Sequence, residues 1–332
     1  MNRRKLISLL SISVMAAMML LSCGGKAQRH EEGNIEIQRF DRVLFETPVS
    51  ELRGAVQTFA ASFRSPLLTL YPDDPQFMLQ LQDFMSDSTV RDIFRITSRR
   101  YPTLFWLEAQ LTDALAEAQR LDDEIRIDQV ATYVSCLFDY AQRVAVDRES
   151  GSVLVSLDQY ALGNMESYSY FGLPMFLVER CDSAYLAVDI LAEVARQYLA
   201  IADESSLTML DLMISEGKVL YFLDQVMEVD DAVKIRYSAD QLDWARKNEA
   251  KIWAYFIQNN LLYEKDFARY HNFVDEAPKT NAFKDSAPRT TEFVGWQIVR
   301  NYMKNNRCTL KELFANSDAQ SILQASGYRP QQ

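Results

Sequence analysis

Two charged residues of opposite sign, Glu216 and Lys218, stand inside an otherwise apolar stretch of the chain. Residues 206–226 carry apolar side chains at the spacing of one helix, namely Met209, Leu210, Met213, Leu220 and Phe222. Burying a charged side chain costs free energy unless the charge is paired or performs a function. The pattern therefore allows two interpretations, a ligand-binding site descended from an active centre or a structural ion pair.

A second candidate ligand site begins at Asp158 and Tyr160, which follow a predicted strand. Further polar and aromatic residues come soon after them: Asn164, Tyr168 and Tyr170. Aromatic rings with polar tips favour contacts with peptides or glycans, so this segment could line a cleft between sheet and helices. Such residues also close ordinary hydrophobic cores, and the sequence leaves both interpretations open.

Three tryptophans in the carboxyl-terminal third, Trp244, Trp253 and Trp296, are candidates for contact with a partner protein. Aromatic residues are enriched where protein interfaces are strongest. They are also common in cores, and Trp244 and Asn248 stand four residues apart on one helical face. Packing is the first explanation for them and a partner-facing patch the alternative.

The chain lacks the residue patterns that other catalytic mechanisms need. There is no Gly-x-Ser-x-Gly turn, no glycine-rich phosphate loop and no cysteine with a credible histidine partner. The chain holds only two histidines, His30 and His271, so it cannot offer two imidazoles one helical turn apart to a zinc ion. We therefore expect no metal and no cofactor.

The amino terminus predicts export and lipidation. A basic head at residues 1–5 precedes the apolar run Leu6–Leu21, and Ser22 and Cys23 close that run. The pattern is that of a bacterial lipoprotein signal, removed at residues 1–22, with acyl chains such as palmitate joined to the Cys23 thiol. An ordinary cleaved signal with an incidental cysteine is the alternative. Residues 23–33 are predicted to form a flexible tether. A signal for retention in the inner membrane would have Asp after the lipidated cysteine; Gly24 stands there instead, which favours the outer membrane, with the protein facing the periplasm.

Charge and composition limit the partners. Loss of the three basic residues in the signal lowers the formal charge from −11 to −14, which argues against nucleic acid and anionic lipid. We expect attachment to the membrane through the lipid and contacts with other envelope proteins. The apolar share of 48% is enough for a buried core in a single domain over 34–332. Cys136, Cys181 and Cys308 allow one disulfide at most, or serve as small buried hydrophobes.

The periodicity predicts an α+β protein, predominantly α-helical, with a small, mainly antiparallel sheet. Alternation indicates a strand at 34–40 and further strands between 127 and 157 around a turn with Gly151. Helical spacing predicts helices over 48–63, 75–85, 89–100, 102–121, 183–202, 206–226, 238–258, 293–304 and 309–314.

Six segments along the chain carry motifs of one family: Ile37–Asp41, Ser156–Gly163, Met213–Tyr221, Tyr237–Trp244, Asn248–Trp253 and Gly295–Met303. In these segments the chain resembles the gliding motility lipoprotein B (GldB) family of Bacteroidetes. It implies a non-catalytic cell-envelope lipoprotein that supports gliding motility and type IX secretion through protein contacts.

A more distant likeness is to zinc metallopeptidases of the gluzincin kind. In those enzymes a His-Glu-x-x-His helix precedes a second helix with a Glu ligand; here Ala192–Tyr198 precedes Glu216 and Gly217. The likeness implies a zincin-like fold without the metal site. It leaves as an alternative function a periplasmic peptide- or glycan-binding protein, or a hydrolase derived from such a fold.

Overall fold

Four short strands form one mixed sheet in a computed structural model that describes residues 34–136, 143–161, 173–200 and 207–330. The strands are β1 (Ile37–Arg39), β2 (Gln129–Tyr133), β3 (Val144–Asp147) and β4 (Ser152–Ser156), in the order β1-β2-β4-β3. β2 pairs in parallel with both β1 and β4, while β3 runs antiparallel to β4.

The α+β class is confirmed, but the expectation of a mainly antiparallel sheet is wrong. A long helical segment separates β1 from β2, and such a crossover returns the chain in the same direction. Only the β3–β4 connection is a hairpin. Gly151 ends its turn with a φ of +62°, and a Cβ there would overlap the Asp128 carboxylate, so the predicted glycine-containing turn is confirmed.

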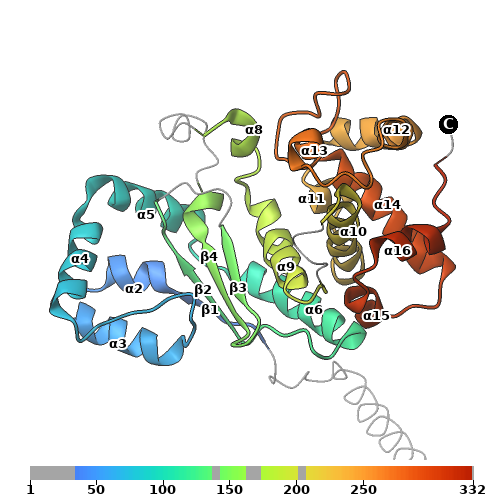
Figure 1. Ribbon diagram of the computed structural model, residues 1–332. Helices are drawn as coiled ribbons and strands as arrows, with labels where there is room; N and C mark the ends of the chain where they lie inside the picture. Colours follow the sequence, from blue (N-terminus) through green and yellow to red (C-terminus); the bar gives the residue numbers. More distant parts are fainter. Residues whose placement is uncertain (1–33, 137–142, 162–172, 201–206, 331–332) are drawn as a thin grey trace, which may run out of the picture. The chain divides into compact units, whose positions relative to one another are not determined.

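The two faces of the sheet belong to two different cores, because neighbouring side chains of a strand point to opposite sides. Ala131 and Leu154 pack with the amino-terminal helices, whereas Val130, Val153 and Val155 pack with the later helices. The sheet is therefore covered on both faces, as Figure 1 shows.

The amino-terminal helices form the first layer. They are α2 (Phe40–Glu46), α3 (Leu52–Ser62), α4 (Pro75–Ser86) and α5 (Ser88–Arg100). Asp74 caps α4 beside Pro75, and Asp87 accepts hydrogen bonds from two amides at the start of α5. The strand expected over 34–40 is shorter than predicted, because the chain turns into α2 at Phe40.

The other layer holds most of the chain. Its longer helices include α6 (Phe105–Leu121), α9 (Leu186–Arg196), α10 (Met209–Val226) and α14 (Thr290–Asn305). The remaining elements are η2 (Leu157–Tyr160), α8 (Met175–Val178), η3 (Ser183–Tyr185), α11 (Asp231–Ile235), α12 (Ala239–Gln258), α13 (Phe267–Val274), α15 (Leu310–Ala315) and α16 (Ala319–Ser326).

Helices α10 and α14 cross at Gly217 and Gly295. A Cβ on Gly217 would overlap the backbone of Gly295, and a Cβ on Gly295 would overlap the Met213 carbonyl. The absence of both side chains lets the two helix backbones meet directly. This close crossing fixes the positions of the two neighbours of Gly217: Lys218 is buried, and Glu216 is half-buried.

Capping boxes confirm several predicted helix starts. Thr208 and Asp211 exchange hydrogen bonds at the start of α10, and Ser238 and Gln241 do so at the start of α12. The helix predicted over 238–258 is thus found almost unchanged. The helices α11, α13 and α16 are too short to show a clear period and were not predicted.

Candidate functional site

Glu216 is held by Arg196 and not by Lys218. The Arg196 Nη2 donates to Glu216 Oε2 at 2.7 Å and its Nε donates to Oε1 at 3.1 Å, a two-pronged contact between α9 and α10. Burial opposes ionisation of Glu216, but the guanidinium outweighs it and the pKa lies below its usual value. Arg196 also donates to Glu193 at 3.2 Å. The carboxylate is thus a fixed partner of a permanent cation.

The same geometry bears on the segment Ala192–Arg196, compared above with a His-Glu-x-x-His helix. Ala192 and Arg196 stand where the two imidazoles would be, and Arg196 binds the glutamate that would be the third ligand. Within residues 34–136, 143–161, 173–200 and 207–330, no three His, Cys, Asp or Glu side chains gather closely enough to hold a metal ion. The likeness to metallopeptidases stays a prediction.

Lys218 is enclosed, with 2% of its surface exposed, where α10 approaches the end of α15. Its Nζ donates to the Asn316 carbonyl at 2.5 Å, and no carboxylate pairs with it in the described part of the chain. Burial without a counter-charge lowers its pKa to about 8. Glu216 and Lys218 therefore lie in separate environments, although only Gly217 stands between them in sequence.

Asp158 is fully buried and ties the end of β2 to η2. Its carboxylate accepts hydrogen bonds from the backbone amides of Ser135 and Cys136, at 3.0 and 3.1 Å, and from the Ser156 hydroxyl at 2.9 Å. Burial outweighs these bonds and raises its pKa. These three hydrogen bonds are all made within the chain, which is the arrangement of a structural brace. Asn164, Tyr168 and Tyr170 lie outside the described residues.

Tyr160 belongs to a buried charge cluster that sequence reasoning missed. Its hydroxyl donates to Asp189 Oδ2 at 2.8 Å, and the same carboxylate pairs with Arg143 at 2.8 Å and Arg236 at 2.6 Å. The three charged side chains are 7–12% exposed. Burial raises the pKa of Asp189, but the two guanidiniums outweigh it and the pKa lies below the usual value. An aspartate on the apolar face of α9 was the signal that could have found this cluster.

A second buried arginine, Arg289, extends the charged core towards α14. Its Nη1 pairs with Glu292 at 2.6 Å and its Nη2 donates to the Ile235 carbonyl at 2.7 Å. Burial raises the pKa of Glu292 despite that guanidinium. Arg236 and Arg289 both have left-handed backbones, with φ of 59° and 44°. Strained non-glycine residues persist only where their surroundings hold them. The hydrogen bond from Arg289 to the Ile235 carbonyl joins the start of α14 to α11, and the ion pair of Arg236 with Asp189 joins α11 to α9.

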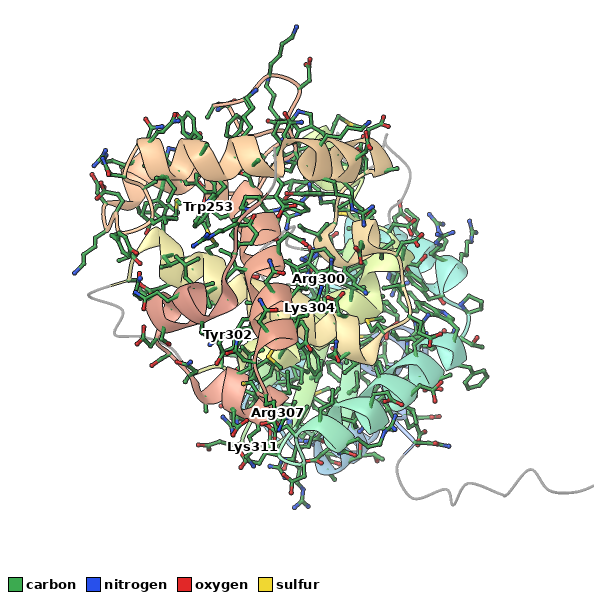
Figure 2. The ribbon with its side chains drawn as sticks, turned by 90° about the vertical axis from the view of Figure 1, so that its right-hand side faces the viewer. Trp253, Arg300, Tyr302, Lys304, Arg307 and Lys311 are labelled. Atoms are coloured by element: carbon green, nitrogen blue, oxygen red, sulfur yellow. The ribbon has the colours of Figure 1, made fainter. Side chains whose placement is uncertain are left out.

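The tryptophans differ in exposure. Trp296 is fully buried, and its Nε1 donates to Asp224 at 2.8 Å. A buried ring presents no surface, so Trp296 drops out of the set of partner contacts. Trp253 and Trp244 are half-buried and pack against Tyr328 and Phe283, at ring distances of 5.2 and 5.8 Å. Figure 2 shows Trp253 of α12 above Arg300, Tyr302 and Lys304 of α14, with Arg307 and Lys311 further down, where the chain passes from α14 to α15.

Two clefts open on the described part of the surface. One, of about 390 Å³, lies between α5, α6 and η3, and its lining includes Arg100, Tyr101 and Trp106. The other, of about 510 Å³, lies between α12 and the loop before α14. Asp158, Tyr160, Glu216 and Lys218 line neither of them.

The sequence allowed at most one disulfide among Cys136, Cys181 and Cys308, and the structure has Cys136 and Cys308 as free thiols. Burial raises the pKa of the Cys136 thiol to about 12, so it is protonated at neutral pH. Cys181 is buried, and its Sγ donates to the Leu177 carbonyl at 3.4 Å. Cys23 lies outside the described residues.

A mixed sheet covered by helices on both faces, with ion pairs buried among those helices, defines an α+β protein. The model of the family described as gliding motility protein GldB matches residues 26–330, and the chain belongs to that family. No curated protein and no solved structure matches the chain.

Membership in a gliding-motility lipoprotein family indicates a protein of the cell envelope. Across the described segments of the chain, no helix combines the length and the apolar character needed to cross a bilayer.

Proposed function

We propose that this protein is a non-catalytic lipoprotein, attached through acyl chains on Cys23, that supports the gliding-motility and type IX secretion machinery by contacts with other envelope proteins. The family match over residues 26–330 carries the proposal. We place the anchored protein at the outer membrane, facing the periplasm, because Gly24 stands where a retention signal would have an aspartate.

The buried charges support a role by contact. Arg196 occupies both oxygens of Glu216, and Asp189 carries two guanidiniums and a tyrosine hydroxyl. These contacts hold both carboxylates towards partners within the chain, and neither residue lines the clefts of about 390 and 510 Å³. Catalytic carboxylates need to reach a substrate within hydrogen-bonding distance.

The anchor has a direct test. Cys23→Ala removes the thiol that would be acylated, so the protein should leave the membrane fraction, and gliding and secretion should fall as they do in a deletion strain. Ser22→Ala keeps the thiol and a small residue before it, and serves as the matched control. Retention of the Cys23→Ala protein in membranes would contradict the lipid anchor.

A second candidate function is binding of a peptide or glycan in the periplasm, and one observation favours it. The cleft of about 390 Å³ presents Trp106, 38% exposed, beside Tyr101 and Arg100. Aromatic rings beside polar groups are typical of glycan and peptide sites. Trp106→Ala should then lower the affinity for short peptidoglycan fragments measured by calorimetry, with exposed Phe105→Ala as control; equal heats for wild type and both variants would refute it.

The other alternative, a hydrolase derived from a metallopeptidase fold, has a separate test. Purified protein should contain no stoichiometric zinc by elemental analysis and should not cleave a casein substrate if the proposed non-catalytic role holds. Stoichiometric zinc together with cleavage that a chelator abolishes would overturn it.

A further inference from the structure

The cleft between α12 and the loop before α14 combines cationic and apolar side chains. Its lining includes Lys247, Lys251, Ala250, Ala254, Tyr255 and Phe283, and no carboxylate belongs to that lining. Ala250 and Ala254 form the floor of the cleft: both are half-buried, and they stand four residues apart on one side of α12. The chain as a whole has a formal charge of −11, whereas this concave site has two lysines and no acid in its lining.

The wall of this cleft is rigid. Phe283 is 5% exposed and packs at 5.2 Å against Tyr255 and at 5.8 Å against Trp244, one of the candidate partner residues. Thr280 holds the loop through hydrogen bonds with Phe283 and Ala287, at 3.1 Å each. A preformed wall lowers the entropy lost on binding.

The lysines around the cleft are available to pair with carboxylates of a partner. Lys251 lies 5.9 Å from the Phe283 ring and forms no ion pair in the described part of the chain. Lys247 forms an exposed pair with Asp243 at 2.6 Å, which solvent weakens. Lys279 and Lys284 are exposed on the loop, with Asp285 as the neighbouring acid.

We propose that this cleft binds an acidic segment of another envelope protein, with carboxylates at Lys247 and Lys251 and an apolar side chain between the alanine floor and Phe283. The inference rests on the proposed role by protein contact and names the surface and the chemistry of the partner. A bilayer is a poorer fit, because a flat headgroup layer cannot enter a concave site of about 510 Å³.

The test uses the full-length protein on an array of random 12-residue peptides made in acidic, neutral and basic sets, each with the same apolar content. The acidic set should retain the protein, and retention should fall as salt rises. Lys247→Glu with Lys251→Glu should weaken retention about tenfold or more, since it replaces two attractive contacts by repulsive ones.

Two further variants separate the cleft from the charge of the whole protein. Lys304→Glu with Arg307→Glu makes the same change of charge on exposed residues of the α14–α15 face, visible in Figure 2, and should leave retention within about twofold. Ala250→Trp fills the cleft without changing charge and should weaken binding. Circular dichroism melting shows that each variant is folded.

Three results would overturn the inference: equal losses in the two charge-reversal variants, no preference for the acidic set, or no effect of Ala250→Trp in a folded protein. A photo-crosslinker at Ala254 in cells gives an independent readout. Adducts should map to acidic segments of other proteins, and adducts only with lipid or a second copy would count against it. If deletion of the protein abolishes gliding but no peptide set on the array retains the protein, the proposed binding of an acidic segment in this cleft is refuted and the proposed function is unaffected.

Discussion

Asp189→Asn is the sharpest test of the buried charge cluster. The native carboxylate accepts from Arg143 at 2.8 Å, from Arg236 at 2.6 Å and from Tyr160 at 2.8 Å, and its side chain is 7% exposed. Asparagine keeps one acceptor oxygen but turns an NH₂ group towards a guanidinium, leaving two buried cations without a counter-charge. Breaking a buried pair in this way costs about 3–5 kcal/mol.

The expected cost translates into a measurable change in thermal stability. For a domain of roughly 300 residues, 1 kcal/mol shifts Tm by about 1.6 °C, so Asp189→Asn should lower Tm by about 5–8 °C. Urea unfolding followed by circular dichroism gives the same quantity independently. Asp243→Asn removes an exposed ion pair with Lys247 and should change stability by less than about 0.5 kcal/mol.

The dependence on pH gives a second readout for Asp189. Its folded-state pKa lies below the ordinary 3.8, so its stabilising contribution is present above pH 3.8 and is lost as the pH falls through the folded-state pKa. The gap in stability between wild type and Asp189→Asn should therefore narrow in acid. A gap under about 1 kcal/mol at pH 7, or one that stays constant down to acid unfolding, would refute the reasoning.

Two further substitutions test the packing of α10 against α14 and against the end of α15. Gly295→Ala should destabilise by about 2–4 kcal/mol in urea unfolding, because its Cβ would overlap the Met213 carbonyl; Gly54→Ala, with open space around it, should be neutral or slightly stabilising, and equal behaviour of the two would contradict the close crossing. Lys218→Met should be about 1–2 kcal/mol more stable than wild type at pH 7, since it removes a buried charge but also the hydrogen bond to Asn316. The lysine pKa falls from 10.5 to about 8 on folding, so wild type should gain stability between those pH values and the advantage of Lys218→Met should disappear; a constant advantage would argue against a charged Lys218 in the core.

The sequence predicted most long helices because their information is local. Helix α12 shows this well: Ser238 and Gln241 are close in sequence, and their capping box fixes the start of a helix that ends at Gln258 as expected. The hairpin at Gly151 was predicted for the same reason: glycine is the residue that favours a left-handed turn conformation, so its presence between two strands is a local signal. The strand predicted over 34–40 was too long, since β1 has three residues and α2 follows it directly. Alternation over a few residues also fits the first turn of a helix.

The candidate sites were predicted less well. Glu216 and Lys218 were correctly singled out as charges inside an apolar helix, but their partners, Arg196 and the Asn316 carbonyl, come from distant segments. Trp296 carries no sequence mark that separates an enclosed ring from an exposed one. Whether a polar residue braces the core or faces solvent depends on what packs over it.

The sequence alone determined the elements and the family: helical periods, caps, a glycine turn and ordered motifs are written in neighbouring residues, and the family model matches 26–330. Tertiary structure decided the direction of the strands and the partner of every buried charge. Parallel pairing follows from the path of a long crossover, and Asp189 meets Arg143 and Arg236 only after segments 46 and 47 residues away have packed around it. Contacts of that kind depend on three-dimensional distance, which the order of residues does not specify.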